Sequence, residues 1–222
     1  MASPSLRSYQ RITHEKMLLD GEDDLKTFLK VMDLLGDKLG PLLIQCPYFS
    51  RAKFRTLGFF LETLEPFLNQ LPMDHQWVVE VRNRNWLSEK LYSVLRRDGV
   101  ALALVDHAWI PRPRELFETG DPVTADFTYI RWLGDRKAIE ELTTVWNKLV
   151  IDCTAEMEEW LPAMQKLLKR RLTIYAFFNN HFQGHGPASA RAFSEMLERT
   201  VGKRTAETAR PASARAQQTN LF

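Results

Sequence analysis

Four side chains that can bind anions or transfer protons lie in apolar stretches of this sequence. Glu80 and Arg82 are two positions apart in "WVVEVR", Asp106 ends "ALALVD", and Arg131 lies in "FTYIRW". Two carboxyl groups can act as general acid and base when their surroundings separate their pKa values. Guanidinium groups bind phosphates and carboxylates through two parallel hydrogen bonds. These residues therefore predict a site for a small anionic or polyhydroxylated substrate.

A further polar group follows the last apolar stretch, "TIYAFF", where Asn179, Asn180 and His181 come in succession. Asn amides can orient substrate hydroxyl groups, and a His side chain can move a proton near neutral pH. The residues that we expect to be catalytic are Glu80, Asp106 and His181. The residues that we expect to bind substrate are Arg82, Arg131, Asn179, Asn180, Gln45 and His14.

Each of these residues also has a purely structural interpretation. Glu80 and Arg82 can pair with each other or with neighbours, because buried charges are usually paired for reasons unrelated to catalysis. Asp106 can cap the following loop. Asn179 and Asn180 can be turn residues, since Asn tolerates left-handed backbone angles. The repetition of polar residues at the ends of successive apolar stretches favours a functional edge.

Alternating strand and helix patterns are expected to position these residues. Short apolar runs followed by amphipathic stretches predict a parallel α/β sheet, in which the carboxyl ends of the strands form the site. The predicted strands are 41–46, 77–82, 101–106, 127–132 and 173–178. The predicted helices include 23–35, 52–70, 87–97, 154–169 and 187–200.

The composition indicates which classes of partner and which cellular compartment to expect. The 222 residues carry a net charge of only +2, so the chain has no overall basic field of the kind that favours nucleic acid. No apolar run has the length of a membrane span, so we expect a cytoplasmic protein without a membrane partner. Cys46 and Cys153 lack metal-ligand spacing and are expected to be free thiols. No motif identifies a cofactor or a metal, and both stay open.

The end of the chain differs in composition from the rest. We expect residues 1–200 to form one domain and residues 201–222, which are small, polar and Pro-containing, to be a disordered tail. Its last residues, "QTNLF", are similar to the pentapeptide that binds the bacterial sliding clamp, with Gln218, Leu221 and Phe222 in the expected places. A frayed tail with two apolar residues is the alternative interpretation.

The stretches "WVVEVRNRNWL", "LRRDGVALALVDH", "ADFTYIRWLG" and "IYAFFNNHFQGHGPASA" resemble, in this order, the DUF72 (YecE-like) family. The resemblance implies a TIM-type (β/α) barrel and assigns no reaction. Nothing in this sequence corresponds to the first two or three strands of the family. We therefore expect an incomplete barrel and a truncated chain that is poorly soluble on its own.

Three classes of function remain open at this stage. The first is an enzyme that acts on a sugar-like or phosphorylated small molecule at the carboxyl edge of the strands. The second is a nucleic-acid-processing protein, because endonuclease IV is a barrel relative and "KLLKRR" at 166–171 could contact phosphates. The third is a ligand-binding module without a reactive pair.

Overall fold

The computed structural model describes residues 10–201, and these residues are organised around one parallel sheet of five strands. The strands follow one another across the sheet in chain order, from β1 to β5. Their bounds are β1 Leu42–Gln45, β2 Trp77–Glu80, β3 Ala101–Asp106, β4 Phe127–Trp132 and β5 Thr173–Phe178. In a (β/α) barrel, too, neighbouring strands follow one another in chain order. The five described strands do not close into a barrel, because β1 and β5 form the two edges of the sheet.

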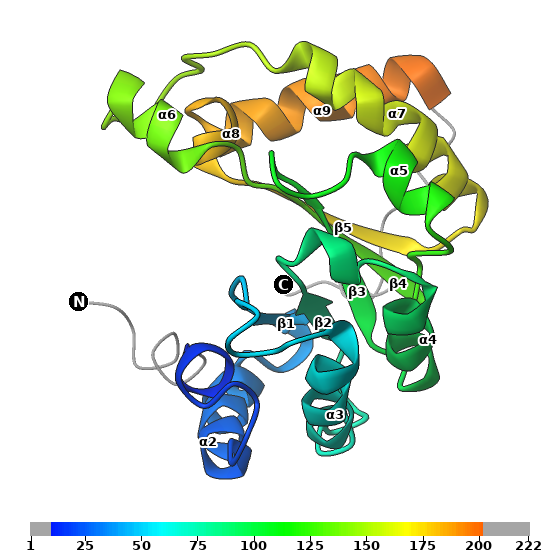
Figure 1. Ribbon diagram of the computed structural model, residues 1–222. Coiled ribbons are helices and arrows are strands. Elements are labelled where there is room, and N and C mark those ends of the chain that lie inside the picture. Colours follow the sequence, from blue (N-terminus) through cyan, green and yellow to red (C-terminus); the bar gives the residue numbers. More distant parts are fainter. Residues whose placement is uncertain (1–9, 202–222) are drawn as a thin grey trace, which may run out of the picture.

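Helices connect the strands, as the alternating pattern predicts. In Figure 1, α2, α3 and α4 lie below the fan of strands and α5 to α9 lie above it. The long helices are amphipathic: α7, for example, buries Met157, Trp160, Met164 and Leu167, which recur every three or four residues. The α-helices are α2 Glu22–Met32, α3 Leu57–Leu68, α4 Glu89–Arg97, α5 Pro113–Glu118, α6 Arg136–Leu142, α7 Thr154–Lys169, α8 Asn180–Gln183 and α9 Gly186–Val201. Short helices of other types are η1 Arg11–Glu15, η2 Asp33–Lys38 and η3 Arg84–Trp86.

The predicted elements differ from the observed ones mainly at their ends. The strand predicted over 77–82 ends at Glu80, so Arg82 lies in the following loop. The helix predicted over 52–70 begins only at Leu57, because residues 46–56 form a long connection after β1. The short helices α5, α6 and α8 were not predicted, since each is too short to show a helical repeat.

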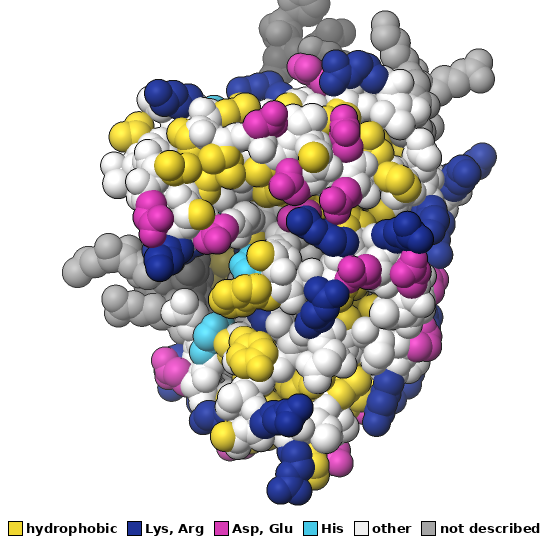
Figure 2. All heavy atoms as spheres, turned by 45° about the horizontal axis from the view of Figure 1, so that its top comes forward, with side chains coloured by type: hydrophobic (Ala, Val, Ile, Leu, Met, Phe, Trp, Pro, Cys, Tyr) yellow, Lys and Arg dark blue, Asp and Glu magenta, His cyan; other side chains and the backbone are white. Residues whose placement is uncertain are grey.

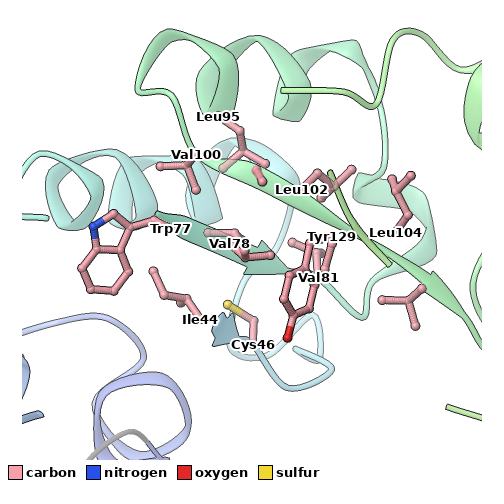
Figure 3. Packing of buried hydrophobic residues seen from close by; sticks show 14 of the residues in the cluster. Ile44, Cys46, Trp77, Val78, Val81, Leu95, Val100, Leu102, Leu104 and Tyr129 are labelled. Carbon is pink, nitrogen blue, oxygen red and sulfur yellow. The ribbon is translucent and has the colours of Figure 1, made fainter. Parts of the chain in front are cut away.

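The hydrophobic core extends across the sheet. Figure 3 shows core side chains from four neighbouring strands: Ile44 of β1, Val78 of β2, Leu102 and Leu104 of β3, and Tyr129 of β4. On the face towards α7 and α9, Trp132 stacks on Phe178 and contacts Trp160 and Phe193. These contacts fix that face of β4 and β5 against helices, and the opposite face carries the charged residues described next.

Candidate functional site

The centre of the candidate site is Glu80, a fully buried carboxylate at the end of β2. Arg131 of β4 donates a hydrogen bond from Nη1 to Oε2 of this carboxylate. Arg82 lies in the loop after β2 and forms an ion pair with the same carboxylate, with its Nε 2.5 Å from Oε1 of Glu80. The angles at these two atoms are not those of a hydrogen bond. Arg131 also donates to Oε1 of Gln45, at 3.1 Å. The structure therefore brings four of the predicted residues together.

The strand register explains why these four side chains meet. Gln45 of β1 is paired with Glu80 of β2, so the two side chains project from the same face of the sheet. On β3, between β2 and β4, the same face carries Ala101, Ala103 and Val105, and Val105 is the direct partner of Arg131. None of these three side chains is long, so the Arg131 side chain can cross β3 and reach Glu80.

The charges of the cluster do not cancel. Two guanidinium groups face one carboxylate, which leaves an excess of one positive charge. The side chains of Arg82 and Arg131 are 22% and 19% exposed, whereas that of Glu80 is 0% exposed. The carboxylate is thus shielded from water, while both arginine side chains keep part of their surface accessible. This arrangement can accept an anion from solvent.

Aromatic side chains border the cluster on the same face. Phe177 of β5 is paired with Arg131 and is 46% exposed. Its ring centroid lies 4.9 Å from that of Tyr129. Burial raises the pKa of the Tyr129 hydroxyl, and the positive charge of Arg131 opposes this shift. The partly accessible side chain of Arg131 therefore lies next to an accessible aromatic ring.

Asp106 does not belong to this cluster. It is paired with Trp132, whose ring packs against α7, and so it projects from the opposite face of the sheet. Its Oδ2 accepts a hydrogen bond of 2.6 Å from Nε1 of Trp160 and lies 3.6 Å from Nη1 of Arg112. Burial raises the pKa of Asp106, against the effects of Trp160 and Arg112. The expectation that Asp106 shares a cavity with Glu80 is wrong, because the two residues lie on opposite faces of the sheet.

The Asn-Asn-His sequence forms the turn after β5. Oδ1 of Asn179 accepts from the backbone N–H of His181, which caps the short helix α8. Oδ1 of Asn180 accepts from the N–H of Gly186 at the start of α9. The ring of His181 lies against Trp146, with Nε2 3.3 Å from Glu140. The structural interpretation therefore accounts for both Asn side chains, and it places His181 beside α6.

The two remaining histidines of interest lie in different places. His14 is exposed in η1, where its Nδ1 is 2.7 Å from Oγ1 of Thr13, and it makes no contact with the cluster within residues 10–201. His107 was not among the predicted site residues. The pKa of His107 is lowered, mainly by burial and further by the positive charge of Arg82. Its position directly after the strand 101–106 was the signal that could have identified it.

The two cysteines are not candidate nucleophiles. Burial raises the pKa of Cys46 to about 12, with a smaller contribution from the charge of Glu80. Burial likewise raises the pKa of Cys153 to about 11. Both thiols are free, as expected. A thiol that stays protonated at neutral pH is a poor nucleophile.

Other expectations concern partners. Within the described residues, no group of His, Cys, Asp or Glu side chains could hold a metal ion, and no helix could cross a membrane. Two members of the basic stretch 166–171 are engaged: Lys166 lies over the ring of Phe117, and Arg170 pairs with Asp121. The predicted tail and its Gln218, Leu221 and Phe222 lie outside the described part of the chain.

Comparisons with known proteins agree with the fold and assign no activity. The family model described as "Protein of unknown function DUF72" matches residues 5–215. The crystal structure of a DUF72 family protein from Thermotoga maritima superimposes with a TM-score of 0.63 and 26% sequence identity, covering 85% of this chain and 71% of that one. The comparison with curated proteins gave no match. The chain therefore belongs to the DUF72 family of proteins of unknown function.

Proposed function

We propose that the carboxyl edge of the sheet binds a small anionic ligand through Arg82 and Arg131. The observation that carries this proposal is the charge imbalance around Glu80, where two guanidinium groups share one buried carboxylate. A phosphate or carboxylate group would neutralise the remaining charge. Within residues 10–201, each guanidinium group keeps N–H donors without a hydrogen-bond partner, and these can bind the anion.

The surroundings of the two arginines favour a ligand with an organic part. Phe177 offers an accessible ring face, and Gln45 supplies an amide next to Arg131. An apolar wall with a few convergent polar groups is typical of small-molecule sites. A sugar phosphate or a hydroxylated carboxylate has the matching chemistry. The strand order supports an arc of a TIM-type barrel, whose carboxyl edge is where barrels bind ligands.

Glu80 has a positioning role in this proposal. Its two oxygens orient the two guanidinium groups, and its burial prevents direct contact with a solvent-borne ligand. His107 is the group that could exchange a proton with the ligand. Its lowered pKa favours the neutral imidazole at neutral pH, which can accept a proton.

The proposal is tested by calorimetric titration with ribose 5-phosphate and with inorganic phosphate. We expect Arg131→Ala or Arg82→Ala to weaken binding of ribose 5-phosphate by about 2–5 kcal/mol, because each removes a largely desolvated charge contact. Arg84→Ala is the matched control, since Arg84 pairs with Glu115 at the surface. Unchanged affinity in both variants, with the fold intact by circular dichroism, would leave the cluster as a structural network.

A further inference from the structure

A hollow lies between the loops that follow β1 and β2. Its volume is about 670 Å³, and its lining includes Tyr48, Arg51, Arg55, Asn85 and Trp86. Neither Arg82 nor Arg131 lines it, and none of its lining residues is acidic. It is therefore distinct from the cluster around Glu80, although both lie at the carboxyl edge of the sheet.

The hollow is built on rigid supports. Asn83, which is 4% exposed, links the two loops: its Oδ1 accepts from the N–H of Phe49 at 3.0 Å, and its Nδ2 donates to the O atom of Phe49 at 2.8 Å. Below them, Trp86 stacks on Phe60 with ring centroids 4.7 Å apart. Side chains that are held by such contacts keep a binding surface organised before a ligand arrives.

The basic residues of the hollow are not neutralised by the described chain. Arg51 and Arg55 of the lining, and Lys53 between them in the chain, are exposed and form no ion pair with any residue in 10–201. By contrast, nearby Arg84 and Arg97 are paired with carboxylates.

A further cation lies close to the start of α3. Nζ of Lys90 is 3.8 Å from the position that a Cβ atom would take at Gly58, one residue beyond the lining residue Leu57. Lys90 likewise forms no ion pair with the described residues. Positive groups that gather without a counter-charge repel one another, and an anion removes that repulsion.

The hollow also offers contacts for a flat ring. Tyr48 is 67% exposed on its border, although a Tyr side chain usually buries much of its ring. Asn85, another exposed residue of the lining, carries an amide that can both donate and accept hydrogen bonds. A ring that stacks on Tyr48 would place its polar edge near an amide and an attached phosphate near the arginines.

We propose that this hollow binds a nucleotide, with the base on Tyr48 and the phosphate on Arg51, Arg55 and Lys90. The site differs in ligand and in residues from the cluster around Glu80, and the inference does not rest on the function proposed above. The basic side chains favour a ligand with a phosphate group. The exposed ring of Tyr48 favours a ligand that also carries a flat ring.

Calorimetric titration of the full chain at low salt tests the site with AMP, adenosine, inorganic phosphate and a single-stranded oligonucleotide. We expect AMP to bind at least about tenfold more tightly than adenosine or phosphate, since it uses both parts of the hollow. The double variant Arg51→Ala/Arg55→Ala should lower AMP affinity by at least about tenfold. Tyr48→Ala should weaken AMP binding and leave phosphate binding unchanged.

The controls separate this site from other basic surfaces. Lys137→Ala on α6 removes an exposed cation elsewhere and should not change AMP affinity, whereas Arg131→Ala tests whether AMP binds at the cluster around Glu80 instead. AMP binding no tighter than phosphate binding would overturn the proposal. So would binding of the oligonucleotide alone, a loss in Lys137→Ala equal to that in the double variant, or a loss only in Arg131→Ala. Thermal melts of each variant establish that the chain is folded.

Discussion

At the scale of single residues, Glu80 gives the sharpest test of the cluster. Glu80→Gln keeps the shape of the side chain and removes the counter-charge of two mostly buried guanidinium groups. We expect the free energy of unfolding in urea to fall by about 3–5 kcal/mol, because the remaining charges stay desolvated without a partner. Glu115→Gln, in the exposed pair with Arg84, should cost no more than about 1 kcal/mol. Equal losses in the two variants would contradict the description of Glu80 as an interior charge.

Asp106 predicts a pH dependence of stability. Its pKa is raised in the folded state, chiefly by burial, above the ordinary value of 3.8. The folded protein then binds this proton more tightly than the unfolded chain, so its contribution to stability is present below pH 3.8 and is lost as pH rises through the folded pKa. Asp106→Asn keeps an acceptor for Trp160, and relative to this variant the wild type should lose stability as pH rises from acid to neutral.

Urea unfolding at several pH values measures this difference. Asp152→Asn is a control of opposite sign, since the hydrogen bond from Thr154 lowers the pKa of that exposed carboxyl. A wild type that gains stability over Asp106→Asn with rising pH would show that the ion pair with Arg112 outweighs burial.

At the scale of elements, the loop after β4 packs against the backbone of α8. Gly134 has φ +70°, and a Cβ atom there would lie 2.1 Å from the O atom of His181. We expect Gly134→Ala to destabilise the protein by about 1–3 kcal/mol beyond the cost of a positive φ alone, because the backbone must move. Gly99→Ala is the matched control, with φ +64° and open space around it. Equal urea midpoints for the two variants would show that the close approach costs nothing.

At the scale of the whole molecule, the two unpaired edges of the described sheet predict association between molecules. In the described residues, β1 and β5 each pair on one side only, and Phe177 of β5 is 46% exposed. Exposed strand edges with apolar side chains favour pairing between molecules. We expect the sedimentation coefficient of the wild type to rise with protein concentration and Phe177→Lys to reduce this rise. Phe59→Lys on α3, where the ring is 50% exposed, should not. The same concentration dependence in all three proteins would exclude the β5 edge.

The charges of the described residues do not form one large region of a single sign on the face in Figure 2. Figure 2 shows basic and acidic side chains interspersed over one face, in keeping with the net charge of +2. Broad, salt-dependent attraction to nucleic acid requires a more uniform positive field. The proposed binding of a small anion therefore depends on a small group of side chains, the pair of arginines at Glu80.

The sequence by itself determined the order and type of the main elements. Apolar stretches of four to six residues alternate with amphipathic ones, and this period follows from local backbone geometry. It also brought Gln45, Glu80 and Arg131 to one edge, because polar residues that end parallel strands share that edge. The bounds of α7 are those predicted, since its apolar residues keep a helical repeat to the end.

Only the tertiary structure decided which face of the sheet each polar residue occupies. Asp106 and Glu80 both end apolar strands, yet the register pairs Asp106 with Trp132 on the face covered by α7, whereas Glu80 is paired with Gln45. The sequence pattern does not show the offset between neighbouring strands, and a shift of one residue reverses the face. The hollow beside Tyr48 was missed for a related reason. Two loops separated by a strand and a helix form it, and the link between Asn83 and Phe49 spans 34 residues of the chain.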